Sequence, residues 1–461
     1  MKPYPAYKDS GVKWIGEIPE HWKTRKLKYL ADISPSNVDK KSKEDERSVA
    51  LCNYVDVYKN EFITSRLDFM EATASDSQIE KFALSRGDVL LTKDSEDPSD
   101  IANPALVHEE FQNVICGYHL THIKPGNNLY GGYLFRLIQS KSINSYFEVN
   151  AKGITRYGLG TEAFLNFITV LPPLPEQTTI ANFLDHKTAQ IDAAIDKHRQ
   201  LIELLREHRA AIINEAVTAG VDENGQLRQK PRCLPAAGWK DSGVEWIGAV
   251  PAHWEVVRLK YLIAHITGGG TPSTENRAFW NGDIPWVSPK DMKTKVITST
   301  QDYITEEAIF NSSTNLIAPD SLLIVFRSGI LKHTLPVATN TCKVSLNQDM
   351  KAITPASDVS VEYLKHLHLG LENEILTFCS KVGATVDNID MQFYLNFEVP
   401  VPLSQEEQQR IVDFIETETT RIDREIDLAQ QEIGLLEEYR QSLIAEAVTG
   451  KIDVRDYVLE D

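Results

Sequence analysis

The 461-residue chain lacks the short sequence signatures of most enzymes. There is no GxxxxGK[ST] phosphate loop, no GxGxxG, no HExxH and no GxSxG. The Asn/Asp-Pro-Pro-aromatic tetrad that an amino-methyltransferase needs is also missing, and the twelve histidines form no ligand cluster visible in the sequence. We therefore expect no catalytic residue, no metal site and no cofactor in this chain.

Cysteine is scarce, and long apolar runs are missing. None of the five cysteines belongs to a CxxC pair, which argues against a zinc site and against a disulfide framework. The N-terminus MKPYPAYKDS has neither a basic segment followed by an apolar one nor an Arg-rich amphipathic pattern. The longest apolar stretches are strand-sized. We expect a cytoplasmic protein without membrane contact.

Positive charge is in deficit overall, with a formal net charge of −18. The deficit is uneven, because residues 401–461 carry 6 basic and 16 acidic groups. The remainder is close enough to neutrality for local basic faces, so the average does not exclude a nucleic-acid partner.

An internal repeat dominates the sequence. Residues 8–30 match residues 240–262 at 15 of 23 positions, including the phrase "DSGVxWIGxxPxHW". A second match joins 176–222 to 407–453, and sparse framework pairs such as Tyr133 and Tyr363 lie between these blocks. The chain is thus a tandem pair of units, each made of phrase, variable domain and helix. The alternative is a duplication without functional meaning.

Apolar residues spaced alternately four and three apart predict two long helices with coiled-coil seams. Pro175 suits a first helical turn, Ser404 with Glu407 resembles a capping box, and Gly220 and Gly450 end the two helices. We expect the helices to pair with each other as an antiparallel coiled coil; the alternative is that each packs on its own variable domain. The predicted seam consists of Leu184, Ile191, Ile195, Ile202, Leu205, Ile212, Ile415, Ile422, Ile426, Ile433, Leu436 and Leu443.

These patterns predict mixed α/β (α+β) domains at 1–170 and 236–400, alternating with helical segments at 171–235 and 401–461. In the second domain, "TGGGTPSTENRAFWNGDIPWVSPKDMK" combines a glycine loop with polar and aromatic residues, the material of base readout and phosphate contact. Trp280 and Trp286 are interpreted as core anchors. The candidate DNA-binding residues here are Gly269, Gly270, Thr271, Ser288 and Lys290.

The first domain lacks this glycine loop. Its candidates come from "LTKDSE", which follows a predicted strand, and from "KGITRYG". "IVFRSG" is the counterpart of the first segment in the second domain. The candidates are Lys93, Ser95, Arg156, Tyr157, Arg327 and Ser328, although a salt bridge would explain Arg156 equally well.

Taken together, the two "DSGVxWIGxxPxHW" phrases, the Pro-rich leads "LPPLPEQ" and "VPVPLSQEEQ", and the "GGGTPS…W…GDIPWV" loop resemble the specificity subunit of a Type I restriction–modification enzyme. The resemblance covers nearly the whole chain. The first domain departs from the pattern by lacking the glycine loop, which leaves its DNA contacts least defined.

The resemblance implies a non-catalytic reader of double-stranded DNA. Each target-recognition domain would read one half of a split, asymmetric site, and the helices would set the unread spacer. Two methyltransferase subunits would bring S-adenosylmethionine and methylate adenine, and restriction/translocase subunits would bring ATP and Mg²⁺. The competing hypotheses are a stand-alone DNA-modifying enzyme and a coiled-coil adaptor without DNA readout.

The repeated phrase is interpreted as the anchor of each domain on the helical frame. Its tryptophans precede "LKYL" in both copies. We expect the first copy to meet the end of the second helix near Gly450, so that the two termini lie close together and the chain is nearly circular. The anchor residues are Trp14, Trp22, Trp246 and Trp254.

Overall fold

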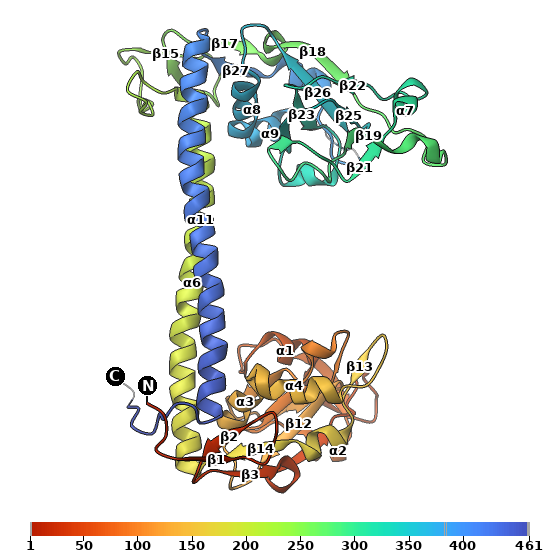
Figure 1. Cartoon of the computed structure of the whole chain (residues 1–461), viewed down its shortest axis with the longest axis vertical. Coiled ribbons are helices and arrows are strands. Elements are labelled where there is room, and N and C mark those ends of the chain that lie inside the picture. The colour runs from red at the N-terminus through yellow and green to blue at the C-terminus, as the bar shows by residue number, and fades with distance from the viewer. Residues whose placement is uncertain (1, 382, 384, 459–461) are drawn as a thin grey trace. The chain divides into compact units, whose positions relative to one another are not determined.

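The computed structural model describes residues 2–381, 383 and 385–458. The chain folds into two compact units, residues 1–198 with 431–461 (unit 1) and residues 199–430 (unit 2). Each unit contains one globular domain and parts of both long helices, α6 (Leu174–Ala219) and α11 (Gln405–Val448) (Figure 1). No helix in the described part of the chain is long and apolar enough to cross a membrane.

The globular domain of unit 1 is built on a five-stranded sheet in the order β4-β12-β8-β10-β6. All neighbouring pairs are antiparallel except β10 and β6. The strands are β4 (Ala31–Pro35), β12 (Leu120–Pro125), β8 (Val89–Thr92), β10 (Pro104–Val107) and β6 (Phe62–Ile63). β8 is buried along its whole length because α3 (Gly131–Gln139) covers one face of the strand and α1 (Tyr54–Lys59) contacts the other.

The domain of unit 2 repeats this order as β18-β26-β23-β24-β20. Its strands are β18 (Ile263–Gly268), β26 (Met350–Pro355), β23 (Leu322–Val325), β24 (Val337–Asn340) and β20 (Val296–Ile297), and α8 (Val361–Gly370) takes the place of α3. The final pair, β20 and β24, is again the parallel one. Divergent sequences therefore build the same sheet twice, as mixed α/β domains.

Smaller elements complete each domain. In unit 1 they are β1 (Tyr7–Asp9), β2 (Glu17–Pro19), β3 (Lys23–Lys26), β5 (Arg47–Cys52), β7 (Met70–Ala74), β9 (Asp94–Ser95), β11 (Val114–Cys116), β13 (Tyr157–Gly158), β14 (Ile168–Leu171), α1 (Tyr54–Lys59), α2 (Asp76–Phe82), α4 (Lys141–Asn150) and α5 (Thr161–Asn166). In unit 2 they are β15 (Trp239–Asp241), β16 (Ala249–Pro251), β17 (Glu255–Arg258), β19 (Trp280–Val287), β21 (Asp302–Ile304), β22 (Leu316–Ile317), β25 (Val344–Leu346), β27 (Glu398–Val401), α7 (Glu306–Phe310), α9 (Glu372–Cys379) and α10 (Met391–Asn396).

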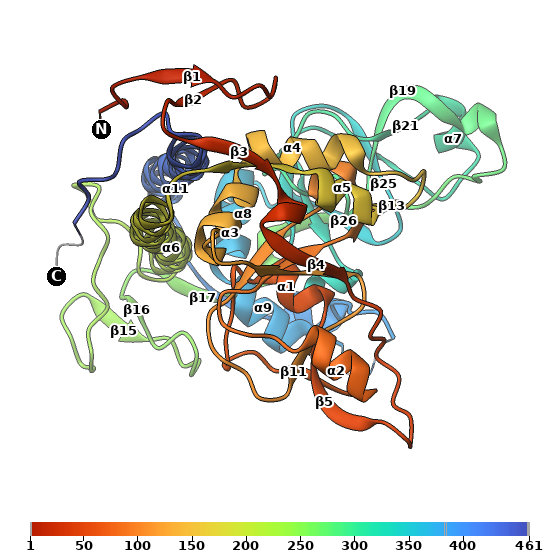
Figure 2. The same cartoon turned by 90° about the horizontal axis from the view of Figure 1, so that it is seen from below.

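Within each unit α6 and α11 lie side by side, and they run antiparallel (Figures 1 and 2). In unit 1 Arg440 donates to Asp192 at 2.9 Å and His198 lies 3.1 Å from Glu432. The predicted pairing of the two helices is therefore confirmed. Most of the predicted seam is buried, and Leu205, Ile433 and Leu436 are half-buried.

A buried glutamate at the start of α6 joins the first copy of the repeated phrase to the helices. Glu176 accepts hydrogen bonds from the Trp22 indole (3.0 Å) and the Tyr4 hydroxyl (2.6 Å), and its other oxygen lies 2.9 Å from His21 Nε2. We name these four residues clamp 1. Trp22 also packs on Gly450, where an added Cβ would lie 3.1 Å from the indole and 2.4 Å from Pro19.

Clamp 2 repeats the arrangement in unit 2 with His253, Trp254, Glu407 and Arg228. Glu407 accepts from the Trp254 indole (3.0 Å) and from Arg228 (2.6 Å), and it lies 2.9 Å from His253. The end of α6 also packs against clamp 2. A Cβ added to Gly220, which directly follows α6, would lie 2.7 Å from Trp254. The Glu407 carboxylate, which the sequence predicted for a capping box, thus binds three side chains that are distant in sequence.

The other tryptophan of each phrase stacks on a phenylalanine at the end of its domain. The rings of Trp14 and Phe167 are 6.0 Å apart and nearly parallel, and those of Trp246 and Phe397 are 5.2 Å apart. Both phenylalanines end the repeated "FLNF" and "YLNF" segments. The phrase therefore contacts the helices with one tryptophan and the domain with the other.

The two ends of the described chain pair with each other inside unit 1. Asp453 N donates to Lys2 O at 2.8 Å, and the Tyr7 hydroxyl donates to the carbonyl of Gly450 at 3.0 Å. Figure 2 shows the β1–β2 hairpin beside the end of α11. Within the described residues, the expectation that the two ends of the chain lie close together is confirmed.

Replacing Glu407 by alanine should destabilise unit 2. The change leaves the buried Trp254 N–H and the Arg228 guanidinium without their acceptor, which should lower the free energy of unfolding by about 3 kcal/mol. Urea unfolding followed by tryptophan fluorescence measures this. Glu406→Ala is the matched control, because Glu406 is exposed one residue away. Equal midpoints for both variants would contradict the assigned role of the clamp.

The same clamp predicts a dependence of stability on pH. Burial raises the pKa of Glu407, but hydrogen bonds from Trp254, Arg228 and His253 outweigh it and hold the pKa below the ordinary 4.5. The stabilisation is then complete above pH 4.5 and is lost as the pH falls through the lower folded-state pKa. The stability difference between the wild type and Glu407→Gln should therefore shrink on acidification below that value. A difference that grows on acidification would refute this sign.

Candidate nucleic-acid interface

Three loops of the unit 1 domain converge beyond the end of β8. Lys93 N donates to the carbonyl of His119 at 3.0 Å, and β9 pairs with β13 so that Ser95 faces Tyr157. We call the segments 93–95, 118–119 and 152–158 loop cluster 1. All four residues that the sequence singled out in this domain lie in it.

Positive and aromatic groups meet in loop cluster 1. The Lys93 ammonium lies 4.7 Å from the centroid of the Tyr118 ring and donates to Ser36 O at 3.3 Å. Arg156 is exposed, and its guanidinium lies 3.4 Å from His119 Nδ1, which is 2.6 Å from Asp94. Cationic side chains held beside aromatic rings on loops suit phosphate and base contacts.

The unit 2 domain brings its equivalent loops together. The amides of Phe326 and Arg327 donate to Asp349 O at 2.8 and 3.1 Å, and Ser328 N donates to Asp387 O at 3.0 Å. We call the segments 269–271, 327–328, 346–349 and 387–388 loop cluster 2. Arg327 is exposed, so its guanidinium is accessible to a ligand.

The glycine loop belongs to loop cluster 2 because its backbone lies directly on the β25–β26 turn. A Cβ on Gly269 would lie 1.9 Å from the carbonyl oxygen of Asn347, and Gly270 N donates to Leu346 O at 2.8 Å. Thr271 is exposed and hydrogen-bonded to Gln348. The glycines thus permit a close approach that presents Thr271 beside Gln348.

The remaining candidates of this domain follow β19. Ser288 is buried, and its hydroxyl donates to Asp291 Oδ2 at 2.8 Å, so it shapes the turn that carries the exposed Lys290. Trp286 is buried and donates from its indole to Gly270 O at 3.0 Å. Trp280 packs against Trp286 with ring centroids 5.3 Å apart. Trp286 therefore supports the glycine loop from the core, as interpreted from the sequence.

Sequence reasoning missed the turn that organises each cluster. Tyr118-His119 and Gln348-Asp349 precede β12 and β26 at the same offset of 230 as the framework pair Tyr133 and Tyr363. That offset was the available signal, but the residues differ in type.

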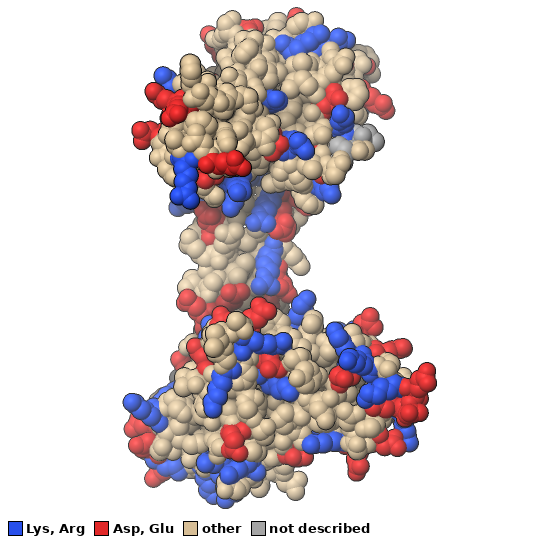
Figure 3. Space-filling model, turned by 90° about the vertical axis from the view of Figure 1, so that its right-hand side faces the viewer, with Lys and Arg blue, Asp and Glu red and all other residues tan. Residues whose placement is uncertain are grey.

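On the faces that Figure 3 shows, Lys and Arg side chains are interspersed with Asp and Glu. Loop cluster 1 carries Lys93, Lys152 and Arg156 with Asp94, whereas loop cluster 2 carries Arg327 with Asp349 and Asp387.

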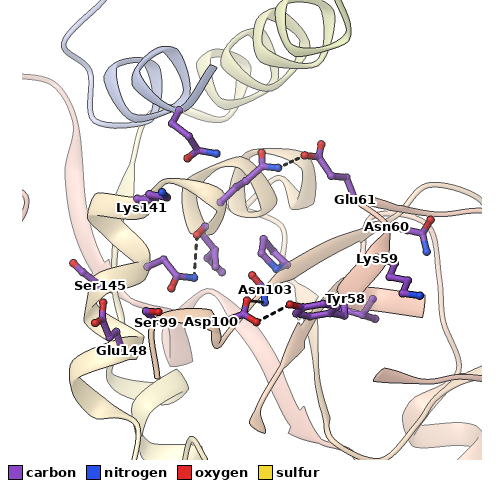
Figure 4. Close-up of a pocket in the computed structure, with 16 residues that line it drawn as sticks. Tyr58, Lys59, Asn60, Glu61, Ser99, Asp100, Asn103, Lys141, Ser145 and Glu148 are labelled. Atoms are coloured by element: carbon purple, nitrogen blue, oxygen red, sulfur yellow. Dashed lines mark hydrogen bonds between the residues drawn. The ribbon is translucent and has the colours of Figure 1, made fainter. Parts of the chain in front are cut away.

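A polar pocket of about 570 Å³ lies elsewhere in unit 1, between α1, α3, α4 and Gln441 of α11 (Figure 4). Its lining groups bind one another: Tyr58 and Asn103 donate to Asp100 at 2.7 and 2.8 Å, and Gln139 donates to Glu61. These three hydrogen bonds lie within the domain, and Glu61 also accepts a hydrogen bond from Arg440 of α11. We assign the pocket a structural role.

Comparison with known proteins identifies the class. The chain matches the family model of the Type I restriction modification DNA specificity domain at residues 19–205 and again at 251–438. These two matches cover more than half of the chain, so the chain belongs to this family. The chain therefore carries two copies of this specificity domain, as expected of a specificity subunit.

Curated relatives carry the same designation. The chain is 42% identical over 186 residues to the EcoR124I/EcoR124II specificity subunit of Escherichia coli, covering 39% of this chain and 45% of the relative. Identity to the MjaIX specificity subunit of Methanocaldococcus jannaschii is 33% over 169 residues, covering 36% and 38%. These two matches span less than half of either relative. The putative MjaX specificity subunit of the same archaeon is 22% identical over 97% of this chain and 98% of its own length.

Solved structures share the fold. A chain from a study of assembly and conformational transition of the type I R-M system aligns with a TM-score of 0.65 at 16% identity, covering 94% of this chain and 99% of that one. The HsdS subunit from Thermoanaerobacter tengcongensis aligns with a TM-score of 0.52 at 17% identity, covering 94% and 98%.

Gly269→Ala should disturb loop cluster 2. The added methyl group would overlap the Asn347 carbonyl, and such overpacking costs about 1–3 kcal/mol. Thermal unfolding measures the loss. Gly329→Ala is the control, because a Cβ there meets nothing within 4 Å and the backbone is not left-handed. If both variants unfold at the same temperature, the close approach at Gly269 does not contribute to the stability of the domain.

Proposed function

We propose that the chain reads a bipartite, asymmetric DNA target for a Type I restriction–modification complex, with each loop cluster reading one half. The observation that carries this proposal is the construction of the clusters. Apart from the glycine loop, both are formed by equivalent loops on five-stranded sheets with the same strand order, yet they present different side chains. Two different base sequences read from one geometry require this combination.

The proposal extends to the complex. α6 and α11, of 46 and 44 residues, would set the unread spacer between the half-sites. Two methyltransferase subunits would use S-adenosylmethionine to methylate adenine, and restriction/translocase subunits would supply ATP- and Mg²⁺-dependent cleavage. The assembly would act in the cytoplasm on chromosomal and incoming DNA.

The residue roles follow from position and chemistry. Lys93 is the first residue after β8 and Arg327 is the second residue after β23, and each carries a cationic group to its cluster. Arginine and lysine are the common partners of guanine and of phosphate. Thr271 and Lys290 in unit 2, and Arg156 and Tyr157 in unit 1, would add polar and stacking contacts. Phosphate contacts by partner subunits would supply much of the affinity.

Methylome sequencing with and without this chain tests the function. A split adenine-methylated motif should disappear when the chain is removed. Turnover by the purified chain with a methyl donor or Mg²⁺ would favour a stand-alone enzyme. Absence of any sequence-dependent footprint in the presence of partners would favour an adaptor.

Single substitutions test the division of labour. Arg327→Ala should weaken binding of the assembled complex about tenfold and relax one half of the methylated motif, whereas Lys93→Ala should act on the other half. Arg258→Ala, an exposed arginine on β17 outside the clusters, is the control. Effects of both substitutions on the same half, or an equal effect of Arg258→Ala, would contradict the assignment.

A further inference from the structure

The junction between domain and helices in unit 1 is built around a buried guanidinium. Arg136, 1% exposed, donates to Asp185 at 2.8 Å, to Thr188 at 3.0 Å and to Glu61 at 3.1 Å. Asp185 and Thr188 belong to α6, so one cation on α3 holds the domain to the helix. We call this set junction 1.

The repeat puts a histidine where junction 1 has its arginine. His366 on α8 is the counterpart of Arg136 at the framework offset of 230, and Glu416 and Thr419 on α11 are the counterparts of Asp185 and Thr188 at the helix offset of 231. The negative partner is thus retained, but the residue at the arginine position carries no permanent positive charge.

His366 has unfilled bonding capacity. It is 6% exposed, and both ring nitrogens are buried without a hydrogen-bond partner among the described residues. Its Nε2 lies 3.9 Å from Glu416 Oε1, too far for a hydrogen bond. Lys365, Arg209 and Lys295 lie near the ring. Buried polar atoms are normally hydrogen-bonded, so a buried imidazole with two unpaired nitrogens is expected to have a binding partner.

A second carboxylate lies within reach. Glu362 precedes His366 by one turn on α8, and the ligand atoms of Glu362, His366 and Glu416 all lie within 4.8 Å of one another. Two atoms bound to one tetrahedral Zn²⁺ at about 2.0–2.2 Å each are separated by roughly 3.3–3.6 Å. The distance of 3.9 Å from His366 to Glu416 would therefore shorten by a few tenths of an ångström on binding. The gap fits an ion between the two groups better than direct contact.

We propose that Glu362, His366 and Glu416 form a Zn²⁺ site that joins α8 to α11 in unit 2. The ion would restore the buried positive charge that Arg136 supplies in junction 1. An imidazole with two carboxylates suits Zn²⁺, whereas Ca²⁺ and Mg²⁺ favour oxygen ligands alone. The Glu416 side chain is 56% exposed, so water can complete the coordination shell.

The surrounding charges set the strength of the site. Glu362 also accepts hydrogen bonds from Lys365 and from Thr339. Each carboxylate oxygen has two lone pairs, so these donors can remain as outer partners that orient Glu362. Lys295 and Arg209 nearby oppose a cation, and Asp423, bonded to Arg209 at 2.9 Å, offsets part of that charge. The expected affinity is below that of closed four-ligand sites.

The site is independent of DNA reading, and titration of the full chain with Zn²⁺ alone tests it. Calorimetry should give one equivalent bound, and Zn²⁺ should raise the unfolding temperature. Glu416→Gln should weaken binding at least tenfold. It alters a half-exposed side chain and should fold normally, which thermal unfolding without metal verifies. Glu418→Gln is the matched control, since Glu418 lies two residues away and pairs with Arg421.

Two further results test the Zn²⁺ site. His366→Asn should also lose binding, and Co²⁺ should give a visible spectrum without thiolate charge transfer, since no cysteine is a ligand. Failure of the wild type to bind Zn²⁺, or equal binding by Glu416→Gln and Glu418→Gln, would overturn the proposal. A thiolate band would overturn it as well, by assigning the metal to cysteine.

Discussion

One buried carboxylate at the start of each long helix is the constraint on which the rest of the structure depends. Glu176 and Glu407 each gather an indole N–H and a further donor in a place where an unpaired charge would be costly. The indoles belong to the repeated phrase. Each clamp therefore joins that phrase to the start of one long helix and to the end of the other. The loop clusters are carried on domains that begin at these clamps.

The periodic and repeated features could be predicted from sequence. The seam follows from spacing because helical geometry is local, and the anchor tryptophans follow from their identity in both repeats. The spacing of Ser404 and Glu407 was less informative. The same spacing is typical of a capping box, and only the fold brings the Trp254 indole to the Glu407 carboxylate. Tyr118 and Gln348 were missed because a turn that pairs with other loops has no periodic signal.

The two junctions illustrate the same limit. Arg136 and His366 occupy equivalent positions, but nothing in a single sequence shows that 366 lies against 416. The pairing depends on α8 packing beside α11, a contact between residues 50 positions apart. The histidine therefore looked isolated in the sequence, although in the structure its Nε2 lies 3.9 Å from a carboxylate on another helix.

The clamps also restrict how the chain can change in length. Glu176 and Gly220 are 44 positions apart along α6, and Glu407 and Gly450 are 43 positions apart along α11. Clamp 1 holds the start of α6 and the end of α11, and clamp 2 holds the reverse ends. A residue inserted into one helix alone would strain a clamp or push the seam out of register. A change of length in one helix would therefore need a matching change in the other to keep both clamps and the seam intact.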